Sequence, residues 1–258
     1  MYPYPLFFGV TLYWIFTALG IVAALVVVRF YGDRIRLPAR LINFTLFLTV
    51  LAVLGGYPCA IFAQALYDFF AGNGFSFRAA TFYGGLLGGA AIFLIGYFGF
   101  GGRVLPDGLH KKCFFAFTGV AACAILIGHA LGRFGCLMAG CCYGRPTHAW
   151  YGVYLPALGM RVMPTQLWEA LFLLILFGCL SYLVWHREGA YALPVYMGAY
   201  GCFRFWIERF RADDRGATLW HLLSPSQLTA LVMIVGAILL AMGIFLWQKR
   251  RGRSVYEF

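Results

Sequence analysis

The chain has 258 residues and a formal net charge of +11, yet only 11% of its residues are charged, 62% are hydrophobic and the mean hydropathy is +0.80. A soluble domain could not bury so much apolar surface, so the composition excludes a soluble globular protein and predicts an integral membrane protein. Anionic lipid headgroups account for the positive charge, and without a basic stripe on a soluble fold it does not indicate nucleic-acid binding.

Seven apolar segments are long enough to cross a membrane as helices. They cover residues 6–30, 41–66, 81–98, 114–131, 166–185, 191–207 and 227–247. None alternates polar and apolar residues as a barrel strand would, so the sequence predicts an all-α integral membrane protein with seven transmembrane helices. No repeat or linker interrupts it, and we expect a single transmembrane domain over residues 1–258. The start of the chain lacks a basic region, which argues against a cleaved signal peptide.

Basic residues between these segments predict the orientation. Those at 34–40, 103–112, 187 and 249–253 fall on one side of the membrane. By the positive-inside rule that side is cytoplasmic, so we expect the N-terminus outside and the C-terminus inside. The opposite side still holds seven arginines: Arg133, Arg145, Arg161, Arg204, Arg209, Arg211 and Arg215. Arginines that topology does not require indicate a phosphate-bearing ligand, although the stretch 211–215 is more typical of a solvated outer loop.

The segment 132–145 is the most informative part of the chain. It follows an apolar run and holds four glycines, three cysteines, and Arg133 and Arg145 near its ends. A charge beside so apolar a run is costly, which indicates a functional site, and glycines allow a ligand to approach closely. His129 precedes Arg133 by four residues, so both side chains should leave one face of the fourth helix. We therefore expect an anionic ligand here.

Two further features allow two interpretations each. Paired glycines at 84–85 and 88–89 suit either a close helix crossing or the approach of a ligand. The outer connection 143–165 holds Trp150 and Tyr154, which are typical of an interfacial aromatic belt and would also suit a lid over a lipid site.

Five sequence blocks, in order along nearly the whole chain, resemble the prolipoprotein diacylglyceryl transferases, a family of seven-helix bacterial inner-membrane enzymes. The blocks are YGGLLG at 83–88, GRFG at 132–135 through GR at 144–145, PTQLWE at 164–169, YGCFRFWIERFR at 200–211 and SPSQ at 224–227. The resemblance implies that the cysteine thiol of a lipoprotein signal peptide attacks the glyceryl carbon of phosphatidylglycerol, and that glycerol phosphate leaves. It implies phosphatidylglycerol, a lipoprotein precursor and the membrane as partners, an active site on the outer side, and no cofactor or metal.

The resemblance and, for His129, its spacing to Arg133 together give the expected roles of individual residues. Expected in the catalytic centre are His129, Arg133, Arg204, Glu208 and Tyr83. Expected around the substrate are Gly84, Gly85, Cys136, Gly140, Cys141, Gly144, Arg145, Gln166, Glu169 and Tyr200. Arg133 and Arg204 are the first choices for phosphate, because guanidinium forks can stabilise the charge of the leaving group. The spacing of Arg204 and Glu208 also suits an ion pair along a helix.

The chain departs from the family pattern at four positions. The family usually has a histidine where Tyr83 stands and an asparagine where Cys136 stands. It usually has an asparagine and a glutamate where Ala139 and Cys141 stand. A phenol with a pKa of about 10 is a poor base at neutral pH, so we hypothesise that His129 supplies the basic or positively charged function lost at position 83.

The thiols of Cys136, Cys141 and Cys142 leave three interpretations open. They can pack or form a disulfide, one can be a covalent or redox centre, or they can bind a metal, for which the usual C-x-x-C or histidine spacing is lacking. The other cysteines are expected to be small buried apolar side chains: Cys59, Cys113, Cys123, Cys179 and Cys202. The leading function is a diacylglyceryl transferase, and the alternatives are a membrane thiol–disulfide protein or a non-catalytic lipid-binding protein on the same fold.

Overall fold

The computed structural model describes residues 4–6, 8–70, 72, 74–77, 80–187, 189–212, 223–252 and 255–256, apart from the side chains of residues 82, 83 and 251. The chain forms two compact units. The first contains residues 1–31 and 115–257, and the second contains residues 32–114 and 258. The expectation of one transmembrane domain stays a prediction.

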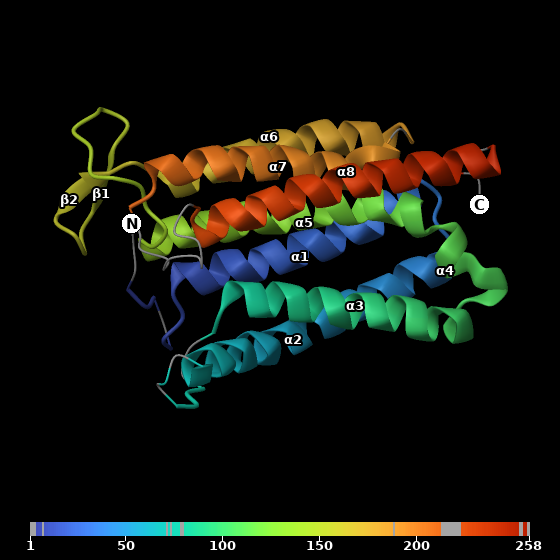
Figure 1. The fold of residues 1–258 in the computed structure, drawn as a ribbon, viewed down its shortest axis with the longest axis horizontal. Coiled ribbons are helices and arrows are strands. Elements are labelled where there is room, and N and C mark those ends of the chain that lie inside the picture. The colour runs from blue at the N-terminus through green and yellow to red at the C-terminus, as the bar shows by residue number, and fades with distance from the viewer. Residues whose placement is uncertain are drawn as a thin grey trace. The chain divides into compact units, whose positions relative to one another are not determined.

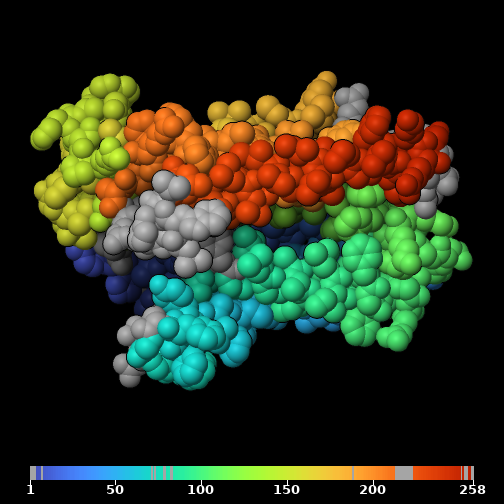
Figure 2. All heavy atoms as spheres, viewed as in Figure 1, coloured from blue at the N-terminus to red at the C-terminus, as the bar shows by residue number. Residues whose placement is uncertain are grey.

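The first unit is a bundle of helices with a small hairpin at one end (Figure 1, Figure 2). Its elements are α1 (Leu12–Arg34, most of which belongs here), α5 (Phe114–Ala139), β1 (Val153–Leu155), β2 (Met160–Val162), α6 (Thr165–Trp185), α7 (Ala192–Ile207) and α8 (Pro225–Arg251), with 3-10 turns at Gly189–Tyr191 and Glu208–Phe210. α7 packs against both α6 and α8. α1 and α5 approach closely because glycines meet there, so that a Cβ on Gly20 would lie 3.1 Å from the carbonyl oxygen of Gly128.

The second unit is a helical hairpin. It consists of α2 (Ala39–Phe70), α3 (Phe82–Val104), a 3-10 turn at Pro106–Gly108 and the short α4 (Leu109–Lys112). Glycines of α3 lie directly against α2, since a Cβ on Gly89 would be 3.0 Å from the carbonyl oxygen of Ala52, and one on Gly84 would touch the Cβ of Ala63. Close helix crossing therefore accounts for these glycines.

Six helices of the described chain are long and apolar enough to cross a membrane: α1, α2, α3, α5, α6 and α8. Each of the seven predicted segments coincides with a helix, with shifted ends. α7 is not among these six helices because it is too short. Its 16 residues make a helix roughly 24 Å long, whereas the hydrocarbon core of a membrane is about 30 Å thick. The structure is therefore that of an all-α multi-pass membrane protein.

The outer faces of the helices suit lipid. On α8, Val232, Val235 and Leu239 expose 64%, 55% and 58% of their surface. Their spacing of three and four residues places them in one stripe of the helix, which lipid tails would cover. Cys179 and Cys202 are also exposed, so the expectation that they are buried was wrong. Buried positions were correctly expected for Cys113 and Cys123, whereas Cys59 is partly exposed.

Candidate active site

The faces of α5, α6 and α7 meet around one buried carboxylate, that of Glu169. Its side chain has no exposed surface. Glu169 Oε1 accepts a hydrogen bond of 2.5 Å from Tyr200 Oη and lies 2.9 Å from Arg133 Nη2. A buried charge needs a partner, and Arg133 provides the opposite charge while Tyr200 provides a hydrogen bond.

His129 joins this group from α5, one turn before Arg133. Its Nε2 lies 3.8 Å from Glu169 Oε1, and its Nδ1 lies 3.3 Å from Tyr196 Oη. The ring also packs edge-on against Tyr200, with 4.7 Å between the ring centroids. The predicted shared helix face of His129 and Arg133 is confirmed, because both reach the same carboxylate.

A second group of charges lies where α7 ends and α8 begins. Arg204 Nη2 donates a hydrogen bond of 2.8 Å to Ser226 Oγ and lies 3.0 Å from Glu208 Oε2, which confirms the predicted ion pair. Glu208 Oε1 accepts a hydrogen bond of 2.9 Å from Ser224 Oγ. Ser224 is the N-cap of α8 and forms a capping box with Gln227. The residues that start α8 therefore also orient Arg204 and Glu208.

Arg211 belongs to the same group, and its expected place in a solvated loop was wrong. Its side chain is 3% exposed, and its Nε lies 3.9 Å from Glu208 Oε2. The burial has a backbone cause, because Arg211 pairs with Gly144 in an antiparallel bridge that holds the end of α7 against the outer connection. The rest of that predicted loop, residues 213–215, lies outside the described residues.

These five charged residues form what we call the arginine–glutamate network: Arg133, Arg204, Arg211, Glu169 and Glu208. The described part of the network thus holds three arginines and two glutamates, and Glu208 lies near two of the arginines. Among the described residues, the buried Arg133 Nε and Arg204 Nη1 have no hydrogen-bond partner. The carboxylate oxygens Glu169 Oε2 and Glu208 Oε2 are likewise buried without a hydrogen-bond partner in the described chain, so the network keeps both donors and acceptors to spare, and the expected anion stays a prediction.

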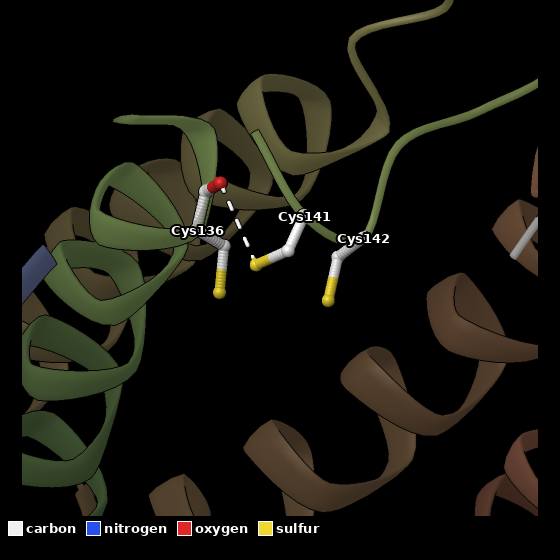
Figure 3. Close-up of side chains that lie close together, drawn as sticks. All are labelled: Cys136, Cys141 and Cys142. Atoms are coloured by element: carbon white, nitrogen blue, oxygen red, sulfur yellow. Dashed lines mark hydrogen bonds between the residues drawn. The ribbon is translucent and has the colours of Figure 1, made fainter. Parts of the chain in front are cut away.

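Three thiols gather at the end of α5 and just beyond it (Figure 3). The Sγ atoms of Cys136, Cys141 and Cys142, which we call the thiol cluster, all lie within 4.8 Å of one another. The chain folds back because Gly140 (φ 72°) and Cys142 (φ 62°) are left-handed. For a cysteine this conformation is strained, and such strain is concentrated at functional sites. All eight cysteines, each of them described, carry free thiols.

The first turn of α6 holds this loop in place. Thr165 Oγ1 donates a hydrogen bond of 2.9 Å to the carbonyl oxygen of Cys142. Gln166 Nε2 donates to the carbonyl oxygen of Cys141. Both residues are fully buried, and Glu169 follows in the next turn of the same helix. One helix therefore positions both the thiol cluster and the central carboxylate.

The thiol of Cys142 is influenced by the charges of the network. Its pKa is lowered, first by hydrogen bonds from its two neighbouring thiols, and then by the guanidinium charges of Arg211 and Arg133. Arg133 thus acts on the thiol cluster as well as on its carboxylate partner. The thiol cluster and the arginine–glutamate network are therefore close enough for guanidinium charges to act on Cys142.

The outer connection 143–165 contains a β-hairpin that backbone hydrogen bonds hold in place. β1 and β2 pair in antiparallel fashion, and the N–H of Gly144 donates to the carbonyl oxygen of Met163 at 2.9 Å. A Cβ on Gly144 would lie 2.7 Å from both the Met163 Cβ and the Phe210 carbonyl oxygen, so only glycine fits this crossing. Trp150 is 89% exposed, which suits an aromatic belt. The alternative of a lid stays a prediction.

For four predicted residues the structure describes only the local surroundings. Gly84 and Gly85 lie in the crossing of α2 and α3 within the second unit. The side chain of Tyr83 is outside the described residues. Arg145 is exposed and contributes its backbone, whose N–H donates at 2.8 Å to the carbonyl oxygen of Phe210. The proposed ligand roles of these four residues stay predictions.

Sequence reasoning missed four residues that complete the network: Tyr196, Arg211, Ser224 and Ser226. Two signals could have found some of them. Tyr196, Tyr200 and Arg204 follow at intervals of four residues and mark a polar stripe on an otherwise apolar helix. The block SPSQ at 224–227 is a helix-start motif, whose capping serine has an oxygen that can also meet a neighbouring side chain.

The fold and the site together define a helical membrane protein with a buried arginine–glutamate network and a cluster of three thiols. The profile of the family described as prolipoprotein diacylglyceryl transferase matches residues 4–243. The chain therefore belongs to the prolipoprotein diacylglyceryl transferase family.

Individual relatives carry the same description. The chain is 29% identical to phosphatidylglycerol–prolipoprotein diacylglyceryl transferase 2 of Clostridium perfringens, over 78% of this chain and 77% of the relative. It is 28% identical to the phosphatidylglycerol–prolipoprotein diacylglyceryl transferase of Clostridium kluyveri, over 96% of both chains. A third relative of that name, from Clostridium tetani, is 31% identical over 51% of this chain and 52% of its own.

Proposed function

We propose that this protein is an enzyme that transfers the diacylglyceryl group of phosphatidylglycerol to the cysteine thiol of a lipoprotein signal peptide. Membership of the family over residues 4–243 and relatives named for these substrates support the proposal. The observation that carries it is the buried arginine–glutamate network, in which Arg133 Nε and Arg204 Nη1 are guanidinium donors without an acceptor among the described residues, as a phosphodiester would provide.

Arg133 and Arg204 are the phosphate ligands in this proposal. When the bond between the glyceryl carbon and the phosphate oxygen breaks, negative charge grows on the departing glycerol phosphate. Fixed guanidinium donors in a site of low dielectric stabilise that charge more than they stabilise the bound lipid. Glu169 and Glu208 hold the two guanidinium groups in place, since each lies within 3.0 Å of one of them.

The other predicted site residues serve the same centre in this proposal. Tyr200 and His129 orient Glu169, and Gln166 fixes the loop that carries Cys141. His129 remains our candidate for a proton acceptor near the network. The lining of the substrate is proposed to include the remaining predicted residues: Tyr83, Gly84, Gly85, Cys136, Gly140, Gly144 and Arg145.

We further propose a topology of seven spans in the bacterial inner membrane, with the N-terminus outside, the C-terminus in the cytoplasm and the site toward the outer side. Basic residues at 34–40 and 249–253 support this orientation. α7 is the seventh span despite its length, because the 3-10 turn Glu208–Phe210 extends it and its charged end is neutralised within the network.

The test is mass spectrometry of the purified protein incubated with phosphatidylglycerol and a signal peptide that carries its cysteine. The peptide should gain the mass of one diacylglyceryl group. Arg133→Ala and Arg204→Ala should each lose about 2–4 kcal/mol of transition-state stabilisation, and lysine should restore little because it lacks the planar fork. Arg209→Ala is the matched control, since Arg209 is exposed in the turn after Arg204.

Two results would contradict the proposal. Normal turnover by both alanine variants would exclude the phosphate assignment. No lipid product from well-folded wild-type protein, under conditions in which the Clostridium perfringens relative produces it, would exclude the transferase function.

A further inference from the structure

The proposed phosphate site gives the three thiol groups of the thiol cluster no chemical role, although Cys136 is proposed to line the substrate. Its three sulfur atoms lie within 4.8 Å of one another, on one side of the loop that follows α5 (Figure 3). Three thiolates bound to one Zn²⁺ at about 2.3 Å would be roughly 3.8 Å apart. The spacing in the structure is therefore within reach of a shared metal ion after small rotations of the side chains.

The backbone that carries the thiols is fixed in advance. Cys136 lies in the last turns of α5, and the carbonyl oxygens of Cys141 and Cys142 accept hydrogen bonds from Gln166 and Thr165 of α6. Ligands held by rigid elements and by supporting hydrogen bonds lose little freedom when a metal binds. The strained left-handed backbone of Cys142 is the local cost of bringing its sulfur to the other two.

The number of ligands indicates the kind of metal site. Within the described part of the chain, no fourth cysteine, histidine or carboxylate joins the three thiols. Structural zinc sites are closed by four protein ligands, whereas catalytic sites use three and keep one position for an exchangeable ligand. Cys141 is exposed, so a ligand from outside can reach this position.

The acceptor thiol needs activation that the network does not readily supply. A free cysteine with a pKa of about 8.5 is mostly protonated at neutral pH. His129 directs one ring nitrogen at Tyr196 and the other at Glu169, and that carboxylate is already paired with Arg133. Coordination to a metal is one of the general ways to turn a thiol into a nucleophile.

We propose that Cys136, Cys141 and Cys142 bind Zn²⁺, and that the cysteine thiol of the acceptor peptide binds as the fourth ligand. The inference rests on the proposed transferase function. When the acceptor thiol binds Zn²⁺, its proton passes to His129, the candidate proton acceptor, or to water, and a metal-bound thiolate remains. The sulfur lone pair then forms the bond to the glyceryl carbon, and the electron pair of the broken carbon–oxygen bond leaves with glycerol phosphate. The thioether product is a weaker ligand and dissociates, and no atom is oxidised or reduced.

Metal binding is tested first, without reference to activity. The full-length protein, purified in detergent, is loaded with Zn²⁺, freed of excess metal and measured by elemental mass spectrometry. We expect about one Zn²⁺ per chain, lost in Cys136→Ser, Cys141→Ser and Cys142→Ser and kept in the control Cys179→Ser, an exposed cysteine of α6. Cys141→Ser is the variant least able to disturb folding, because its side chain is exposed.

The fourth position is tested with Co²⁺ in place of Zn²⁺. Sulfur-to-cobalt charge-transfer absorption should appear in the wild type, and it should change when a cysteine peptide is added but not when its serine analogue is added. A metal content that does not depend on the three cysteines would overturn the site. A stable disulfide among them that excludes Zn²⁺, or a preference for Cu⁺ without response to the peptide, would also overturn it.

A measurement of transfer activity distinguishes a failure of the zinc site from a failure of the proposed transferase function. Chelation should lower diacylglyceryl transfer by at least about tenfold, and Zn²⁺ should restore it. Full transfer by metal-free protein would overturn the zinc inference and leave the transferase standing. Stoichiometric, cysteine-dependent zinc in a protein that never forms the lipid product would overturn the transferase function and leave the metal site standing.

Discussion

At the residue scale, Glu169 links two helices through a single oxygen atom. Its Oε1 accepts from Tyr200 on α7 and pairs with Arg133 on α5. Glu169→Gln keeps the size of the side chain but leaves the buried guanidinium of Arg133 without its counter-charge. We expect a loss of about 3–5 kcal/mol in the free energy of unfolding, measured by thermal unfolding in detergent. Asp107→Asn, at an exposed turn, should leave stability unchanged. Equal stability of both variants would show that Arg133 does not depend on Glu169.

His129 permits a second test at the same scale. His129→Gln should bind phosphatidylglycerol normally but reduce kcat on the order of 10²-fold, because the ring positions both Glu169 and Tyr196. The pH–rate profile distinguishes its two roles. A profile that keeps its shape indicates positioning, whereas the loss of one limb indicates that His129 accepts the thiol proton. An unchanged rate across the whole pH range would remove His129 from the mechanism.

At the scale of elements, the outer hairpin and the 3-10 turn that follows α7 meet at Gly144. Gly144→Ala would place a Cβ against Met163 and Phe210 and should destabilise the protein by about 1–3 kcal/mol. It should also reduce transfer, because Gly144 pairs with Arg211 of the network. Gly178→Ala in α6 is the control: nothing lies within 4 Å of its Cβ position, so stability should be equal or higher. If Gly144→Ala changed neither the stability nor the transfer activity, the hairpin would be able to move and accommodate the added Cβ.

At the scale of the whole molecule, the topology determines which aqueous phase the thiol cluster faces. In intact cells treated with a chelator to remove zinc, a membrane-impermeant maleimide should label Cys141, which is exposed, and Cys141→Ser should remove the label at this position. A cysteine introduced by Lys249→Cys at the end of α8 should be labelled only after lysis. The reverse pattern would contradict the proposed orientation.

The sequence by itself determined the class of the protein and the position of its helices. Hydropathy is a local property, so seven apolar runs predicted helices that the structure contains. Spacing along one helix is also local, which is why the pair Arg204 and Glu208 and the shared face of His129 and Arg133 could be predicted. The capping box of Ser224 and Gln227 rests on the same short-range chemistry, although it was not predicted.

Only the tertiary structure decided which distant residues meet. From the sequence alone, Arg211 is expected in a solvated loop. In the structure it is buried, because its backbone pairs with Gly144, more than sixty residues earlier in the chain. The thiols of Cys136, Cys141 and Cys142 lack a metal-binding spacing, yet the left-handed turn and α6 bring their sulfur atoms together. Burial and side-chain proximity depend on which faces of separate helices pack against each other, and no local pattern contains that information.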